Sequence, residues 1–241
     1  CAMLTVLSSA LNSAMKRGLV ARNVAQLVDR PAIEHREMST WTPQQAEQFR
    51  KEVRTDRLYA CWLLTLAGWR RSEVLGLTWS AVDFDAGTVS VAQGRVVVRG
   101  AGTATGEPKS GRSRRTLPMP ADVMTALRAL RANLAAERLA VGAGYPDTGL
   151  VAVNADGTPL RPETYSKMFA RHCKAAGVPS IRLHDTRHTA ATRMLDSGTT
   201  IAATAKWLGH DPAMTLRVYG HVYDDALASA GEMLLGPAAE S

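Results

Sequence analysis

Four residues in the last third of the chain, together with one arginine upstream, have the types and order that phosphoryl transfer needs. They are His184, Arg187, His210 and Tyr219, preceded by Arg70. A tyrosine hydroxyl has a pKa of about 10, and it becomes a useful nucleophile beside cations or a base that accept its proton. Guanidinium groups stabilise the charge that gathers on the oxygens of a phosphoryl-transfer transition state. The set therefore predicts attack by Tyr219 on a phosphodiester that fixed positive charge holds in place.

The local sequence indicates how these side chains are held. Arg70 falls at a turn, and Glu73 follows it at the spacing of an i,i+3 ion pair that would orient it. Arg187 falls in the first turn of an expected helix. The two histidines, His184 and His210, are candidates for proton transfer or for hydrogen bonding to a phosphate. Taken singly, each residue is more commonly structural: an arginine in a surface ion pair, a histidine capping a helix, a tyrosine packed in the core.

A basic segment at residues 107–115 lies between two strand-like runs. On a hairpin loop, Lys109 could reach into a minor groove and protonate a leaving alkoxide. By composition alone, a solvated basic turn is the more common interpretation of this segment. Four arginines are expected to contact the DNA backbone: Arg71, Arg112, Arg114 and Arg115.

A zinc site is the competing interpretation of one motif. His184 and His188 lie one helical turn apart with Asp185 between them, which is similar to the H-E-x-x-H pattern of zinc hydrolases. The acid is Asp rather than Glu, and Arg187 would put a cation beside the metal. No third ligand has a persuasive spacing, although His210 or Asp211 could serve as the third ligand after folding. We therefore expect no metal in this site.

The composition agrees with a polyanionic partner. The chain has 241 residues, 46% of them hydrophobic, a formal net charge of +7 and a pI of about 9.7. Arginine outnumbers lysine, and a guanidinium group binds phosphate through two donors at once. Three widely spaced cysteines, Cys1, Cys61 and Cys173, form neither a disulfide framework nor a zinc knuckle. With no signal peptide or membrane span visible, the sequence predicts a reducing, cytoplasmic setting and no membrane partner.

The elements that position these residues are predicted to be mainly helical, with one small antiparallel sheet. The sheet of about three strands is expected over 82–117, with Gly100–Gly106 as a flexible stretch in its middle. Helical patterns and caps predict helices at about 2–17, from Thr42-Pro43 onward, 58–67, 72–77, from Pro120 onward, 162–176, 185–196, 200–208, 212–219 and 224–235.

These motifs, taken in order, resemble the tyrosine recombinase family of the phage integrase type. The resemblance covers about Thr40 to Val222 and implies the catalytic-domain fold of that family. It rests on Gly68-x-Arg70, Lys109, His184-x-x-Arg187-His188, Leu208-Gly209-His210 and Tyr219-x-His221.

The resemblance implies a mechanism as well. Tyr219 would form a 3′-phosphotyrosyl link and release a 5′-hydroxyl. Three residues, Arg70, Arg187 and His210, would hold the non-bridging oxygens, while His184 assists proton movement and Lys109 acts as general acid. Neither ATP nor a metal would be needed, so no cofactor is expected. Integration or excision of a mobile element is the favoured role. DNA relaxation by the same chemistry, as in a topoisomerase, and a non-catalytic DNA-binding domain are the alternatives.

The resemblance also divides the chain. Residues 1–30 would be the last helix of a truncated core-binding domain, 31–39 a linker, 40–222 the catalytic domain, and 223–241 a tail helix that neighbouring protomers could exchange. The expected partners are double-stranded DNA, further copies of the full-length enzyme in a tetramer on that DNA, and accessory DNA-bending proteins.

Overall fold

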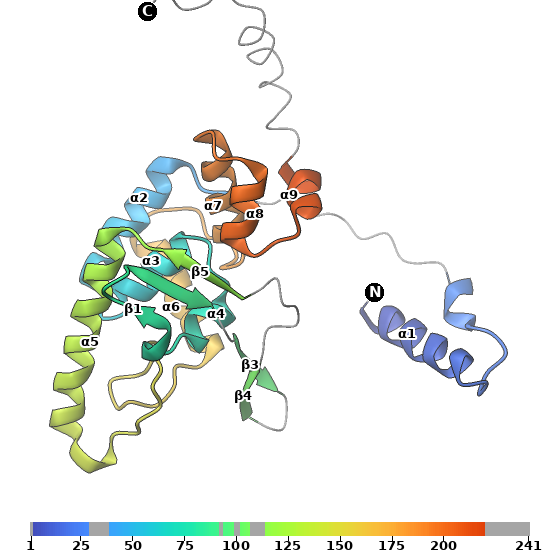
Figure 1. Ribbon diagram of the computed structural model, residues 1–241, viewed down its shortest axis with the longest axis horizontal. Coiled ribbons are helices and arrows are strands. Elements are labelled where there is room, and N and C mark those ends of the chain that lie inside the picture. Colours follow the sequence, from blue (N-terminus) through green and yellow to red (C-terminus); the bar gives the residue numbers. More distant parts are fainter. Residues whose placement is uncertain (1, 29–38, 92–93, 99–101, 107–113, 220–241) are drawn as a thin grey trace, which may run out of the picture. The chain divides into compact units, whose positions relative to one another are not determined.

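The structure is a computed structural model that describes residues 2–28, 39–91, 94–98, 102–106 and 114–219 (Figure 1). By its internal contacts the chain divides into two units, Cys1–Glu37 and Met38–Ser241, and each is described by itself. Most of the predicted linker and the whole predicted tail helix lie outside the described residues. The assignment of domains therefore stays a prediction.

The first unit is one helix with a short return. Helix α1 (Ala2–Lys16) confirms the helix expected at 2–17, and it ends where Gly18 takes a positive φ of 69°. The return contains a 3₁₀ turn, η1 (Val24–Leu27), whose cap Asn23 donates to Ser8 and Asn12 on α1. These bonds hold the turn against the helix.

The second unit begins with three helices that follow the predicted boundaries closely. Thr42 and Gln45 form a reciprocal capping box at the start of α2 (Pro43–Glu52). A 3₁₀ turn, η2 (Val53–Thr55), leads to the buried α3 (Tyr59–Leu66), and the short α4 (Arg71–Gly76) follows after a turn. The chain then passes through η3 (Trp79–Ala81) into the sheet.

A three-stranded antiparallel sheet is present, as predicted. Its order is β1 (Val82–Asp83), β2 (Thr88–Val91) and β5 (Arg115–Pro118). Val89 faces Leu117 in the β2–β5 register, and both side chains are buried. The alternation of buried and exposed residues on β5 therefore gives the sheet one face toward the core.

The prediction for the middle of this region was wrong in two respects. Residues 94–98 fall inside the stretch expected to form the sheet, but they form β3 (Gly94–Val98), which belongs to a separate hairpin. The stretch expected to be flexible contains β4 (Gly102–Gly106), which pairs with β3 so that Val96 faces Ala104. Glycines at both ends suggested a loop, but the threonines between them suit a strand once a partner is available.

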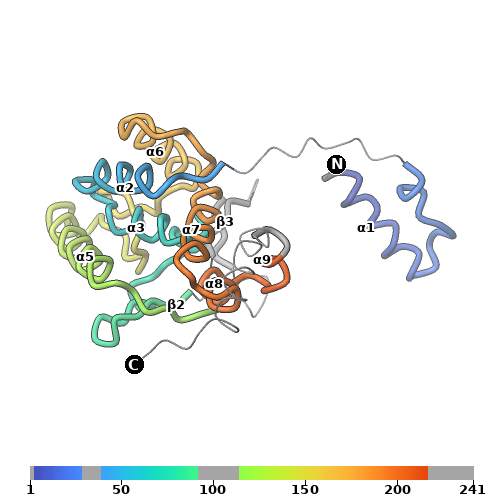
Figure 2. Tube along the Cα trace, turned by 90° about the horizontal axis from the view of Figure 1, so that it is seen from above, coloured from blue at the N-terminus to red at the C-terminus, as the bar shows by residue number. Residues whose placement is uncertain are grey.

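The remainder of the described chain is helical. The long α5 (Ala121–Val141) buries a face that includes Val123, Leu127 and Leu134, and it is followed by η5 (Gly142–Gly144). Then come α6 (Pro162–Ala175), α7 (Asp185–Asp196), α8 (Ile201–Leu208) and α9 (Pro212–Tyr219). Figures 1 and 2 show α7 and α8 side by side, with α9 beyond α8 and α5 flanking the opposite side of the unit. Within the described ranges, no helix is long and apolar enough to cross a membrane.

Aromatic side chains dominate the core between α2, α3 and α6. Trp62 stacks on Tyr165 with ring centroids 4.3 Å apart, and Phe49 lies 5.2 Å from Phe169. Each such side chain stabilises the fold by about 1.5–3 kcal/mol through burial. Cys61 is fully buried among them.

Gly68 allows the helices of the core to approach the helices that carry the motifs. It ends α3 with a φ of 84°, and a Cβ at this position would lie 2.7 Å from Leu208 and 3.0 Å from Ala190. Both conformation and contact therefore require glycine where α3 meets α7 and α8.

We expect Gly68→Ala to destabilise the chain by about 3 kcal/mol, because left-handed backbone strain adds to a steric clash. The matched control is Gly177→Ala, since Gly177 has a φ of 67° but no atom within 4 Å of its Cβ position. Strain alone should cost about 1 kcal/mol there. Urea unfolding of both variants measures the difference, and equal losses would contradict the role given to close packing.

Candidate active site

Arg70 is held at the start of α4 by the acid three residues later. Glu73 accepts from the Arg70 backbone N–H at 2.9 Å and from its Nη1 at 2.7 Å. The expected i,i+3 ion pair is therefore present, and it doubles as a cap for the helix. The Arg70 side chain keeps 31% exposure, so its guanidinium group remains accessible from solvent.

A second arginine, Arg115, binds the other side of the same carboxylate. Arg115 Nη2 lies 3.0 Å from one Glu73 oxygen and Nη1 lies 3.2 Å from the other. Burial acts to raise the pKa of Glu73, but the hydrogen bonds and charge of Arg115, aided by Arg70, outweigh it and lower the pKa. The Arg115 side chain, which was expected to contact the DNA backbone, is only 5% exposed and binds these protein groups, and the DNA contact stays a prediction.

Arg187 comes from the first turn of α7 and is almost completely buried. Its Nη1 donates to the Gly68 carbonyl at 2.7 Å, its Nη2 donates to the Leu208 carbonyl, and its Nε donates to His210 Nε2 at 2.9 Å. The guanidinium group therefore joins the turn before Arg70 to the end of α8. The start of α7 is itself anchored, because Asp185 accepts from both Nε and Nη2 of Arg182.

Three arginines converge on three consecutive carbonyl oxygens at the C-terminal end of α8. Arg115 Nε donates to Trp207 at 2.7 Å, Arg187 donates to Leu208, and Arg70 Nη2 donates to Gly209 at 3.3 Å.. The last carbonyls of a helix lack partners within the helix and carry its negative dipole end. This helix end therefore gathers three like charges that would otherwise repel one another.

His210 follows directly, in a turn that its backbone holds rigid. Gly209 ends α8 in the left-handed conformation, and the His210 N–H donates to Ala205 at 2.9 Å. Since Nε2 accepts from Arg187, the neutral imidazole carries its proton on Nδ1, a buried atom with no hydrogen-bond partner among the described residues. Burial, followed by the charges of Arg187 and Arg70, lowers the pKa of His210 to about 3. His210 is therefore a neutral hydrogen-bond donor near pH 7.

His184 lies just before α7 with its ring perpendicular to that of His188, the centroids 5.4 Å apart. Desolvation, followed by the charge of Arg187, lowers the pKa of His184. Its imidazole is therefore neutral near pH 7 and able to accept a proton. His184 and Arg70 line the same groove.

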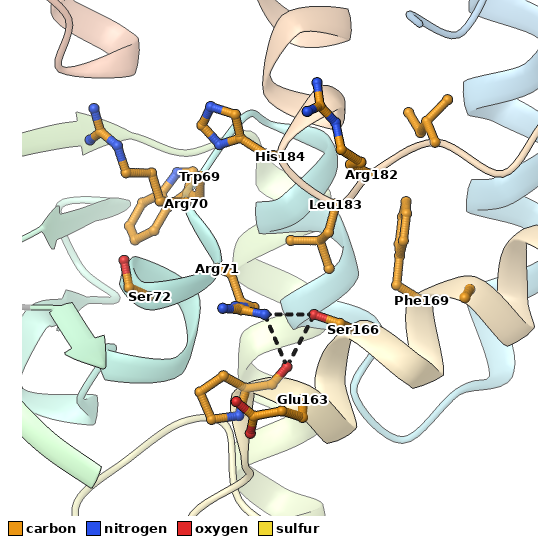
Figure 3. Close-up of a pocket in the computed structure, with 13 residues that line it drawn as sticks. Trp69, Arg70, Arg71, Ser72, Glu163, Ser166, Phe169, Arg182, Leu183 and His184 are labelled. Carbon is orange, nitrogen blue, oxygen red and sulfur yellow. Dashed lines mark hydrogen bonds between the residues drawn. The ribbon is translucent and has the colours of Figure 1, made fainter. Parts of the chain in front are cut away.

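A groove of about 730 Å³ adjoins Arg70 and His184 (Figure 3). Its apolar wall includes Phe169 and Leu183. Arg71 lies in the same groove and donates to Ser166 at 2.8 Å, which anchors it to the first turns of α6. The groove thus extends from the arginine cluster along α6.

The structure brings together Arg70, Glu73, His184, Arg187 and His210. Tyr219 is the last residue of α9, but its side chain lies outside what the structure describes, as do Lys109 and Arg112. Arg114 is exposed immediately before β5. The parts assigned to these residues stay predictions.

Among the described residues, no group of three or more His, Cys, Asp or Glu side chains is arranged to hold a metal ion. Both oxygens of Asp185 accept from Arg182, so this acid is committed to an ion pair. That geometry does not favour the zinc interpretation of His184 and His188.

Two parts of the site were missed from the sequence. The Arg182–Asp185 pair had a local signal, because i,i+3 spacing of opposite charges predicts an ion pair. The pair of Arg115 and Glu73 had none, since 42 positions separate the two residues. The sequence offered one indirect indication: the basic run continues into a predicted strand, where alternate side chains face the core.

Comparison with known proteins identifies a family. A sequence model described as the phage integrase family matches residues 40–226. A tyrosine recombinase XerC-like protein of Caldanaerobacter subterraneus is 28% identical over 211 residues, which are 82% of this chain and 54% of that protein. The chain therefore spans little more than half the length of this relative.

Solved structures with the same fold include two integrases. The Tn1549 transposon integrase in complex with transposon right end DNA has a TM-score of 0.76 and 24% identity, covering 96% of this chain and 77% of that one. A lambda integrase tetramer bound to a Holliday junction has a TM-score of 0.55 and 18% identity, covering 88% and 57%. At these identities the likeness establishes the fold, mainly α with a small sheet, as predicted.

The lowered pKa of His210 predicts a pH dependence of stability. The unfolded chain binds a proton on this residue below about pH 6.5, whereas the folded chain does not until about pH 3. The stabilisation is therefore present above pH 6.5 and is lost as the pH falls, at about 1.4 kcal/mol per pH unit. Wild type should lose about 2 kcal/mol more than His210→Gln between pH 6.5 and pH 5. Urea unfolding at both pH values measures this loss, and equal losses would contradict the neutral imidazole.

Proposed function

The chain belongs to the phage integrase family, and from this premise we propose that it carries the catalytic part of a site-specific DNA recombinase. In this proposal Tyr219 cleaves one DNA strand, remains linked to its 3′-phosphate, and later returns the phosphate to a 5′-hydroxyl. The favoured role is integration or excision of a mobile element.

One observation carries the proposal: Arg70, Arg187 and His210 meet at the end of α8, each with its donor groups held by the fold. A phosphodiester entering this cluster would meet two guanidinium groups and the Nδ1–H of a neutral imidazole. Donors fixed before the reaction stabilise the charge of the transition state without having to reorganise. The name of the relative, a tyrosine recombinase, and the integrase names of the two solved structures support this proposal.

The cleavage step assigns one task to each residue. The phenol oxygen of Tyr219 attacks the phosphorus and gives its proton to His184, whose lowered pKa leaves it neutral. The bond from phosphorus to the 5′ oxygen breaks, and Lys109 donates the proton that turns this oxygen into a hydroxyl. One ester bond forms and one breaks, so the bond energy is retained without ATP, a metal or another cofactor.

Rejoining runs the same step in reverse. A 5′-hydroxyl from a partner strand attacks the phosphotyrosine, and the tyrosine leaves with its proton restored. Two pairwise exchanges, each of which cleaves and rejoins one strand of either duplex, recombine the two duplexes. We assign Arg71, Arg112 and Arg114 to contacts with the DNA backbone along the strand that enters the cluster.

The organisation of the complete enzyme is part of the proposal. Residues 40–222 form the catalytic domain, 1–30 end a core-binding domain, 31–39 link the two, and 223–241 exchange between protomers. We propose a homotetramer on DNA, supported by the lambda integrase tetramer of the same fold, acting in the bacterial cytoplasm. Accessory DNA-bending proteins stay a prediction.

Tyr219→Phe should abolish covalent attachment to DNA, lowering it by more than about 10³-fold, because the nucleophile is gone. The substrate is a pool of nicked duplexes with randomised sequence. Cleavage near the nick releases a short fragment that dissociates, so rejoining is prevented and the adduct accumulates. A denaturing gel detects the adduct. Tyr145→Phe is the matched control, since its hydroxyl lies away from the arginine cluster and has no partner among the described residues. Equal adduct from wild type and Tyr219→Phe would refute the proposal.

Chelation by EDTA should leave adduct formation within about twofold of its original rate, because the charges come from side chains. Loss of activity on chelation would favour the zinc alternative. With a supercoiled plasmid that carries two selected sites, strand exchange should accompany cleavage. Relaxation without exchange would favour a topoisomerase, and DNA binding without any adduct would favour a non-catalytic DNA-binding domain.

A further inference from the structure

We infer that Arg115 is a positioning residue of the reaction, acting through Glu73 on Arg70 and through the end of α8 on His210. The inference rests on the proposed function, because a positioning role presupposes the cleavage reaction. Its structural basis is a set of contacts that a basic residue next to a DNA-binding loop would not ordinarily make.

The first part of that basis is that each carboxylate oxygen of Glu73 accepts two hydrogen bonds. One carboxylate oxygen accepts from Nη1 of Arg70 and from Nη1 of Arg115, and the other accepts from the Arg70 backbone N–H and from Nη2 of Arg115. With only 6% of the Glu73 side chain exposed, water has little access to substitute for a lost bond. Two of the four bonds that fix the carboxylate therefore come from Arg115.

The second part is the balance of charge. Arg70 and Glu73 alone would form a neutral pair, which attracts a phosphate weakly. Arg115 adds a second positive charge to the same carboxylate, so the three groups together keep a net charge of +1. Because the side chains of Arg115 and Glu73 are only 5% and 6% exposed, the charges of this pair are only weakly screened. Arg115 thereby leaves Arg70 electrostatically available to an incoming phosphate.

The third part is the link to the opposite wall of the site. Arg115 Nε donates to the Trp207 carbonyl at 2.7 Å, one residue before the carbonyl that accepts from Arg187 and three residues before His210. Its guanidinium carbon also lies 5.9 Å from the ring centroid of Trp69, the residue before Arg70. One side chain thus ties the turn that carries Arg70 to the helix end that carries His210.

A direct DNA contact is the competing role, and the two roles predict different kinetics. A phosphate contact contributes to DNA affinity and to the dependence of that affinity on salt. Loss of one such contact changes the slope of log affinity against log salt concentration by about one. A positioning residue contributes to the rate of cleavage after DNA is bound, since misplacement of a catalytic group by about 1 Å can cost 100-fold.

The experiment compares Arg115→Met, Arg115→Lys and the double variant with Glu73→Gln, all in the 241-residue chain. Arg138→Met, on the exposed end of α5, is the matched control that also removes one positive charge. The substrate is a nicked duplex recovered from the randomised pool. Single-turnover adduct formation at saturating DNA, DNA affinity across a salt series, and thermal unfolding are measured for each variant.

We expect Arg115→Met to form adduct about 100-fold more slowly at saturating DNA, with affinity within about threefold and an unchanged salt slope. Arg115→Lys should recover about tenfold, because a lysine keeps the charge but cannot bridge both carboxylate oxygens and a carbonyl. The double variant should form adduct at a rate within about threefold of the rate of Arg115→Met, since both substitutions break the same linkage. Arg138→Met should match wild type.

A wild-type rate at saturating DNA, combined with weaker affinity and a salt slope reduced by about one, would overturn the inference. If Arg115→Met does not fold, Arg115→Lys decides the question, since it keeps charge at a buried site. Full activity of a folded Arg115→Lys variant would overturn the bridging role.

A readout without cleavage separates this inference from the proposed function. The guanidinium Nε–H resonance of Arg70, assigned by its loss in Arg70→Lys, should shift in Arg115→Met and stay in place in Arg138→Met. Absence of adduct with wild type would refute the proposed function alone. An Arg70 resonance unmoved by Arg115→Met would refute the positioning role whatever the activity.

Discussion

The site depends on the hydrogen bonds that three arginines donate to the C-terminal end of α8. Three consecutive carbonyls, at 207–209, accept hydrogen bonds from arginines that come from β5, from α7 and from the turn before α4. Arginines at such short range repel one another, and a buried guanidinium group loses its hydration. The helix end compensates both effects with unpaired carbonyl oxygens and the negative end of its dipole. A cluster of positive charge can therefore exist before any phosphate arrives.

That arrangement places strict demands on the surrounding chain. Gly68 must lack a side chain so that Leu208 and Ala190 can approach, and Gly209 must turn left-handed so that His210 follows the carbonyls directly. The aromatic core beneath α3 supports this meeting of helices, because it fixes the element that ends at Gly68. Packing and chemistry are thus coupled at the same few positions, and substitutions chosen for stability there also alter the site.

Charge balance explains why a single acid suffices among several arginines. Glu73 partners both Arg70 and Arg115, so it orients two cations without neutralising both. His210 contributes a donor without a charge, since burial, followed by the charges of the neighbouring guanidinium groups, lowers the pKa of its imidazole and keeps it neutral. The site therefore combines positive charge for attracting a phosphate with a neutral group that can donate a hydrogen bond across a wide pH range.

The sequence alone determined the motif residues and the start of each α-helix in the described ranges to within about one residue, because caps, left-handed glycines and apolar periodicity are local signals. Thr42 capping α2 and Gly209 ending α8 are examples. The tertiary structure alone decided that β3 and β4 form a separate hairpin, and that Arg115 turns inward to Glu73 while its neighbour Arg114 stays exposed. Strand pairing and ion pairs between distant residues depend on which partners folding brings together, and a run of basic residues looks the same in sequence whether its side chains meet solvent or a buried carboxylate.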